Sequence, residues 1–175
     1  TLEDAGWVSS NPAVHGPVHA FICNSDFIAQ AAEIPPASRN IIYYGYCRKN
    51  LGRPRHDSPR SPFVAGLLGR IGGSKGHDLV LAAAERLRNA GRIDIRFRFI
   101  GEAATAQEAA AWRSRVAERG LGDSIQFRGY QSDIAAEMQQ IDLLVIPSTA
   151  EPFGRIFCEA AEAQCPVLLS DSGGL

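Results

Sequence analysis

The chain has 175 residues, of which 45% are hydrophobic and 21% are charged, and its net charge at pH 7 is −1. This composition is typical of a globular domain that can bury a core. A nearly neutral chain has no long-range attraction to nucleic acid, so we expect no nucleic-acid partner. No apolar segment approaches the length of a membrane span, and no signal peptide is visible.

The first part of the chain is predicted to hold two short strands and one helix before a linker. A strand is expected over residues 18–23, Asn24-Ser25-Asp26 would cap a short helix that ends near Ala32, and a second strand is expected over 41–44. From Gly45 onward Pro, Gly, Ser and cations replace the apolar residues, which is typical of a linker. We expect these cations to be solvated, with an acceptor phosphate or a membrane surface as the alternative. The cations are Arg48, Lys49, Arg53, Arg55 and Arg60.

Strands and helices alternate from residue 63 onward. Strands are predicted over 63–68, 96–100, 125–127, 143–146 and 167–169, and helices over 76–90, 106–119, 133–140 and 154–164. This alternation predicts an α/β domain, a Rossmann-like, doubly wound parallel sheet with helices on both faces. Ligands of such sheets bind at the carboxyl ends of the strands.

A glycine-rich loop, Gly69-Arg-Ile-Gly-Gly-Ser-Lys75-Gly76, follows the first of these strands. It does not match the Walker A phosphate loop, because Ser74 precedes Lys75 and Gly76 follows it, and the chain has no dinucleotide fingerprint after a strand. The chain contains only two lysines, so Lys75 is not part of a lysine-rich surface. One Arg and one Lys near a helix start predict a site for a diphosphate, and a solvated loop is the alternative.

A second candidate site follows the predicted strand at 143–146. A helix that starts near Gly154 would present unpaired N–H groups and a positive dipole end, which favour an anion. Glu151 lies in the loop and Glu159 in the helix, so both carboxylates could face one pocket and accept hydrogen bonds from sugar or ribose hydroxyls. The alternative is a solvated ion pair between Arg155 and Glu159.

No metal site is expected, because the histidines are scattered and the chain has no Asp-x-Asp pair. The cysteines lack zinc-like spacing, so we expect reduced thiols in a cytoplasmic protein. The histidines are His15, His19, His56 and His77, and the cysteines are Cys23, Cys47, Cys158 and Cys165.

The order of these segments resembles the donor-binding domain of retaining glycosyltransferases of family 4 (group 1), which have the GT-B fold. The resemblance is close over 62–175 and looser over 18–45. Beside Glu151-x7-Glu159, the matching segments are Gly69-Arg70, Lys75-Gly76, Phe99-Ile100-Gly101, Phe127-Arg128-Gly129-Tyr130, Asp142, Pro147-Ser148, Pro152-Phe153-Gly154, Pro166-Val167, Ser170-Asp171 and Gly173-Gly174.

The resemblance implies an enzyme of carbohydrate biosynthesis that moves a sugar from a nucleotide-sugar to an acceptor, with retention at the anomeric carbon. Arg70 and Lys75 would bind the donor diphosphate and stabilise its developing charge, and together with Glu151 they would form the catalytic set. Glu159 would hold the ribose, and Glu151 would hold the sugar.

Further donor contacts follow from the same resemblance. Gly69 would belong to the phosphate loop, and Gly129 and Tyr130 would lie beside the base. The N–H groups around the start of the last helix would face sugar and phosphate; these belong to Phe153, Gly154, Arg155 and Ile156. No metal or other cofactor is implied.

The resemblance also implies a domain organisation. Residues 1–45 would be the tail of an N-terminal acceptor domain, 46–61 an interdomain linker, and 62–175 the donor-binding domain, incomplete at its C-terminus. The acceptor would be a sugar, a lipid or a protein held by the missing N-terminal domain, so we expect the chain alone to bind donor without transferring sugar. The protein would be cytoplasmic, with the inner face of the membrane as an alternative location. Gln164-Cys165 stands where the family usually has Gly.

Two alternatives remain open from sequence. A nucleotide-sugar epimerase with the GT-B fold would use a similar pocket without an acceptor. A nucleotide-binding module without activity would share the fold and turn over nothing.

Overall fold

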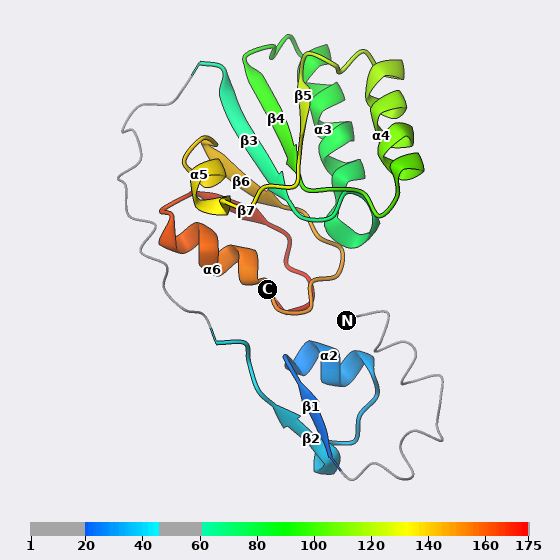
Figure 1. Cartoon of the computed structure of the whole chain (residues 1–175), viewed down its shortest axis with the longest axis vertical. Coiled ribbons are helices and arrows are strands. Elements are labelled where there is room, and N and C mark those ends of the chain that lie inside the picture. Colours follow the sequence, from blue (N-terminus) through cyan, green and yellow to red (C-terminus); the bar gives the residue numbers. More distant parts are fainter. Residues whose placement is uncertain (1–19, 46–60, 175) are drawn as a thin grey trace. The chain divides into compact units, whose positions relative to one another are not determined.

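The computed structural model describes residues 20–45 and 61–174, and it divides into two compact units (Figure 1). The first unit combines residues 20–45, 150–155 and 171–174, and the second combines residues 61–149 and 156–170. All but the last residue of the linker predicted over 46–61 lie outside the described residues.

The first unit contains a small parallel sheet and one short helix. Strands β1 (Phe21–Cys23) and β2 (Arg39–Ile41) pair, and α2 (Asp26–Ala31) connects them through the 3-10 helix η2 (Pro36–Ser38). Helix α2 begins where the sequence predicts, because the Ser25 side chain accepts the Ile28 N–H at 3.2 Å.

The strand predicted over 41–44 is wrong in position. Strand β2 starts at Arg39 and ends at Ile41, since its backbone pairs Arg39 with Phe21 and Ile41 with Cys23. The apolar run that suggested a strand continues past the end of this pairing, and Ile42, Tyr43 and Tyr44 are each 58% exposed.

The second unit is built on five parallel strands in the order β5-β4-β3-β6-β7. The sheet confirms the predicted parallel α/β fold, and three strands have the predicted bounds. The strands are β3 (Phe63–Leu68), β4 (Ile95–Ile100), β5 (Ile125–Gly129), β6 (Leu143–Ile146) and β7 (Val167–Leu169).

Helices connect these strands, with α3 and α4 on one face of the sheet and α6 on the other (Figure 1). They are α3 (His77–Asn89), α4 (Ala106–Glu118), α5 (Ile134–Met138) and α6 (Arg155–Glu162), with the 3-10 helix η3 (Gly73–Lys75) before α3. No helix among the described residues is long and apolar enough to cross a membrane.

The core of the second unit lies between the sheet and helices α3 and α4. Phe97 and Phe99 of β4 are buried there, whereas Arg96 and Arg98 alternate with them on the opposite face. The same cluster includes Leu81 of α3.

Strand β3 is the point at which the strand order reverses. The chain adds strands outward from β3 through β4 to β5, then returns to β6 on the other side of β3 and continues to β7. In sheets of this kind the ligand site lies at the carboxyl ends of the strands at such a reversal. The loops that follow β3 and β6 therefore define where a site is expected.

Candidate functional site

The loops that follow β3 and β6 are joined directly in the second unit. The N–H and hydroxyl of Thr149 both donate to the Ser74 carbonyl, at 2.8 and 3.4 Å. Gly76 has a φ of 77°, and a Cβ added there would overlap the carbonyl of Pro147. Because only glycine accepts both this conformation and this contact, Gly76 allows the two loops to form one surface.

The backbone ladder of the sheet continues past the ends of the strands. The Gly69 N–H donates to the Ile100 carbonyl at 3.0 Å, and the Gly101 N–H donates to the Gly129 carbonyl at 2.9 Å. A Cβ on Gly101 would overlap the carbonyl of Gly69. Three strand ends, those of β3, β4 and β5, are thus held in close contact by glycines.

The glycine-rich loop carries its two cations between β3 and α3. Arg70 is exposed, and Lys75 is half-buried in η3 with its aliphatic stem beside Gly69, since a Cβ there would lie 3.5 Å from Lys75 Cδ. Gly76 caps α3 without a side-chain hydrogen bond. Cations next to a helix start provide the chemistry for binding a phosphate group.

His77 is the first residue of α3, and no role is predicted for it from the sequence. It is 1% exposed, and its Nδ1 accepts the Gly72 N–H at 3.3 Å. Burial lowers the pKa of His77 to about 4; the negative charge of Asp78 raises this pKa and the positive charge of Lys75 lowers it. The imidazole is therefore neutral near pH 7. Its position directly after the loop is the one signal in the sequence that could have drawn attention to it.

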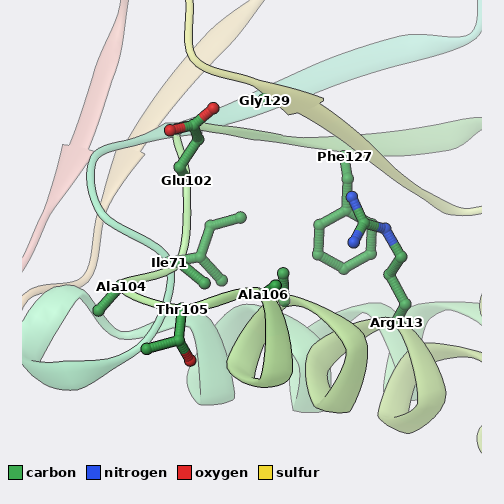
Figure 2. Close-up of a pocket in the computed structure, with 11 residues that line it drawn as sticks. Ile71, Glu102, Ala104, Thr105, Ala106, Arg113, Phe127 and Gly129 are labelled. Atoms are coloured by element: carbon green, nitrogen blue, oxygen red, sulfur yellow. The ribbon is translucent and has the colours of Figure 1, made fainter.

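A pocket of about 300 Å³ lies at the ends of β4 and β5, beside the start of α4 (Figure 2). On one side of the pocket, the Arg113 guanidinium lies 5.5 Å from the centre of the Phe127 ring. The Glu102 side chain and the backbone of Gly101 and Gly129 also line it. The pocket thus combines an apolar ring, a cation and a carboxylate. Next to it along the chain, Tyr130 is 72% exposed.

The start of α4 at the rim of this pocket is fixed by reciprocal caps. The Thr105 hydroxyl accepts the Glu108 N–H, and the Glu108 carboxylate accepts the Ala104 N–H, both at 3.1 Å. This arrangement is close to a capping box, and it satisfies two N–H groups near the helix start.

The loop that contains Glu151 belongs to the first unit. Glu151 is 7% exposed, and its Oε1 accepts the Gly154 N–H at 3.2 Å. The Glu151 carbonyl accepts the Gly174 N–H at 2.6 Å, and a Cβ on Gly173 would overlap the same carbonyl. The Gly154 N–H, which the sequence assigns to the ligand, thus has a partner within its own loop.

The same loop contacts the N-terminal part of the first unit. Ser25 Oγ donates to the Pro152 carbonyl at 2.5 Å. The Phe153 ring packs edge-on against Tyr44, with ring centres 5.4 Å apart, and lies 6.1 Å from Tyr43. The sequence predicts Ser25 only as a helix cap, so its second contact is a feature that sequence patterns missed.

The remaining predicted donor residues lie on α6. Arg155 is exposed, and Ile156 and Glu159 are partly buried. Glu151 belongs to the first unit and Glu159 to the second, so the expectation that both carboxylates face one pocket stays a prediction. Within residues 20–45 and 61–174, no three His, Cys, Asp or Glu side chains come together as a metal site.

The chain matches the family model for glycosyl transferases group 1 over residues 49–175. It belongs to that family. The sequence resemblance to group 1 is thereby confirmed.

Two curated relatives illustrate the similarity. The chain is 35% identical over 130 residues to the 2-deoxystreptamine glucosyltransferase of Streptomyces kanamyceticus. This match covers 73% of this chain and 32% of that enzyme. It is 34% identical over 123 residues to the D-inositol 3-phosphate glycosyltransferase of Nocardia farcinica, covering 67% of this chain and 27% of the relative. The chain thus spans about a third or less of the relatives it matches.

Solved structures share the fold of this group 1 chain. The Anabaena protein Alr3699/HepE in complex with UDP-glucose aligns with a TM-score of 0.76 at 24% identity, over 99% of this chain and 52% of that protein. A glycosyltransferase from Rickettsia africae aligns with a TM-score of 0.73 at 18% identity, over 97% of this chain and 49% of its own. At these identities the likeness concerns the fold.

Proposed function

We propose that this chain supplies the nucleotide-sugar site of a retaining group 1 glycosyltransferase of family 4. The observation that carries the proposal is the glycine-rich loop with Arg70 and Lys75 at the reversal of the strand order, in a chain of this family. The loop follows β3 and is joined to the loop that follows β6. It therefore lies where a parallel sheet of this kind offers a ligand site.

The two cations would act on the leaving group. As the bond between the anomeric carbon and the diphosphate oxygen breaks, negative charge develops on the diphosphate. Arg70 and Lys75 would stabilise this charge, with the start of α3 adding the positive end of its dipole. The acceptor would attack from the side on which the leaving group departs, which retains the anomeric configuration.

Other residues would hold the rest of the donor. Glu159 would accept hydrogen bonds from the ribose, and Glu151 from the sugar. Gly129 and Tyr130 would border the base, and the pocket beside them, with Phe127 and Arg113, offers a surface of suitable chemistry for a planar ring.

A glucose donor is the first to test. One curated relative is named a glucosyltransferase, and one structural neighbour is a complex with UDP-glucose. The acceptor, whether sugar, lipid or protein, would bind outside residues 62–175, with residues 46–61 as the linker and 1–45 as the tail of the acceptor domain. Donor binding would need no metal, so EDTA should leave it unchanged.

Calorimetric titration tests the diphosphate site. Arg70→Ala and Lys75→Ala each remove a charge-assisted hydrogen bond worth roughly 1.5–3 kcal/mol, so the Kd for UDP should rise about ten- to a hundredfold. Uridine, which lacks phosphates, should lose much less. Arg86→Ala, at an exposed position of α3, is the matched control and should change neither Kd.

Two results would contradict the proposal. Equal losses for UDP and uridine in the loop variants would remove Arg70 and Lys75 from the site. Interconversion of UDP-glucose into an isomer without any acceptor would instead favour an epimerase.

A further inference from the structure

The glycine-rich loop is held by a hydrogen bond to His77, the residue that follows the loop, and we call this bond the brace. Gly72 lies between the two cations, and its N–H donates to His77 Nδ1 at 3.3 Å. Gly72 has a φ of 94°, and the next residue, Gly73, has a φ of 56°. Glycines adopt many other conformations equally well, so the sequence of the loop does not itself select this path. A specific contact is needed to select it.

The acceptor atom of this contact is fixed by the hydrophobic core. The His77 ring is 1% exposed and packs edge-on against Phe99, with ring centres 4.8 Å apart. Trp112 lies 5.6 Å away on another side. Phe99 and Trp112 both belong to the core cluster of the second unit. The packing of the core thus sets the position of the imidazole, and with it the position of the Nδ1 atom that the loop contacts.

The contact requires one protonation state. Nδ1 can accept an N–H only when it carries no proton, so the proton of the neutral ring must be on Nε2. Burial holds the pKa of His77 near 4, and the positive end of α3 disfavours the charged ring as well. Nε2 has no hydrogen-bond partner among the described residues. The brace is therefore intact across the physiological range of pH.

We propose that His77 is a positioning residue of the diphosphate site, whose neutral imidazole accepts the Gly72 N–H and so fixes the directions from which Arg70 and Lys75 reach the ligand. His77 acts through the loop and does not touch the ligand. The inference rests on the proposed function, because it assumes that this loop binds a diphosphate. Without the brace, the part of the loop around Gly72 would have to be ordered on binding, which weakens affinity.

Two substitutions separate positioning from packing. His77→Asn keeps an acceptor one bond from Cγ, where Nδ1 stands, but loses the ring. His77→Phe keeps an aromatic ring but loses the acceptor. If His77 positions the loop, His77→Asn should hold the Kd for UDP within about threefold, whereas His77→Phe should raise it about tenfold. The reverse order would show that the ring only fills the core, and would overturn the proposal.

A second measurement tests the bond between Gly72 and His77 without any ligand. Amide hydrogen exchange over residues 69–76 should be faster in His77→Phe than in the wild type, and close to the wild type in His77→Asn. Equal exchange in all three proteins would overturn the proposal. If the wild type binds none of UDP, GDP and ADP, the proposed function fails, while the exchange data still decide whether the brace exists.

A third variant tests whether the acceptor must stand at the position of Nδ1, and circular dichroism checks that it folds. His77→Gln keeps a polar side chain but places its acceptor further from Cγ, near the position of Nε2. It should behave like His77→Phe in both measurements. Unchanged exchange and an unchanged Kd in His77→Gln, with a circular dichroism spectrum like that of the wild type, would contradict the assigned role of Nδ1.

Discussion

Two of the loops with predicted donor contacts, the glycine-rich loop and the loop around Glu151, are stabilised in different ways. The glycine-rich loop is held within the second unit by the ends of neighbouring strands and by His77, which directly follows it. The loop around Glu151 is held within the first unit by residues far away in sequence. Ser25, for example, is 127 residues from its partner Pro152.

The difference shows which changes each loop should tolerate. The glycine-rich loop depends on close backbone contacts, so single added methyl groups near it should be severe. The Glu151 loop shares such a backbone contact, at Gly173, but it also depends on side chains from distant segments, so substitutions in those segments that no local pattern predicts should disturb it. Four experiments follow from this comparison.

The largest effect is expected for Gly76→Ala. The new Cβ would overlap the Pro147 carbonyl, and the residue would keep a positive φ, so we expect a loss of about 3 kcal/mol or more in the free energy of unfolding. Gly91→Ala is the matched control, because Gly91 has a φ of 76° but nothing within 4 Å of an added Cβ. It should cost about 1 kcal/mol. Urea unfolding measures both, and equal losses would refute the steric contribution of Pro147.

The next effect is the pH dependence of stability due to His77. The pKa is lowered from its ordinary 6.5 to about 4 in the folded chain, so on acidification the unfolded state takes up the proton first. The stabilisation is complete above pH 6.5 and is lost as the pH falls toward 4, by about 3 kcal/mol in all. Carboxylates titrate in both proteins, so the informative quantity is the difference in unfolding free energy between the wild type and His77→Asn at pH 7.5, 6, 5 and 4. A difference that does not change with pH would contradict a buried neutral imidazole.

Ser25→Ala tests the distant support of the Glu151 loop. It removes the cap of α2 and the hydrogen bond to Pro152, so we expect a loss of about 2 kcal/mol in unfolding free energy. Thr105→Ala, which removes only the cap of α4, should cost about 1 kcal/mol. If both substitutions cost the same in urea unfolding, the contact with Pro152 contributes nothing.

The smallest effect is expected for substitutions of the two glutamates, which should weaken the binding of different ligands. Glu151→Gln keeps an oxygen that can accept the Gly154 N–H, so the loop should persist while the Kd for UDP-glucose rises about tenfold and that for UDP does not. Glu159→Gln should weaken UDP itself. Glu118→Gln, at an exposed position of α4, is the control. A Glu151→Gln protein that loses both ligands equally would indicate a structural role for Glu151.

Most of the fold could be predicted from the sequence, because its signals are local. The apolar runs of β3, β6 and β7 are bounded by turn residues and gave the correct ends. The position of strand β2 differs from the prediction because its ends depend on pairing with β1, which no local pattern reveals. The sequence does not predict the short helix η3, because a glycine-rich segment carries no helical signal.

The sequence predicts the residue types of the candidate site, which stay a prediction, but it does not predict the contacts that support them. Arg70 and Lys75 could be recognised because cations in a glycine-rich loop suggest an anion site. The bond from Gly72 to His77 depends on burial, and the contact of Ser25 with Pro152 depends on the tertiary fold. Neither contact leaves a periodicity in the sequence that could be detected.

The contacts of the Glu151 loop also bear on how this protein could be recombined with its relatives. A chimaera that exchanged only residues 62–175 would bring in a foreign loop but leave Ser25 and Tyr44 as its old supports. Phe153 and Tyr44 meet edge-on, so a change of one ring shape would leave the other without a fitting neighbour. Ser25, Tyr44 and Phe153 are therefore best inherited as a set, and exchanges that test the proposed donor site should transfer all three together.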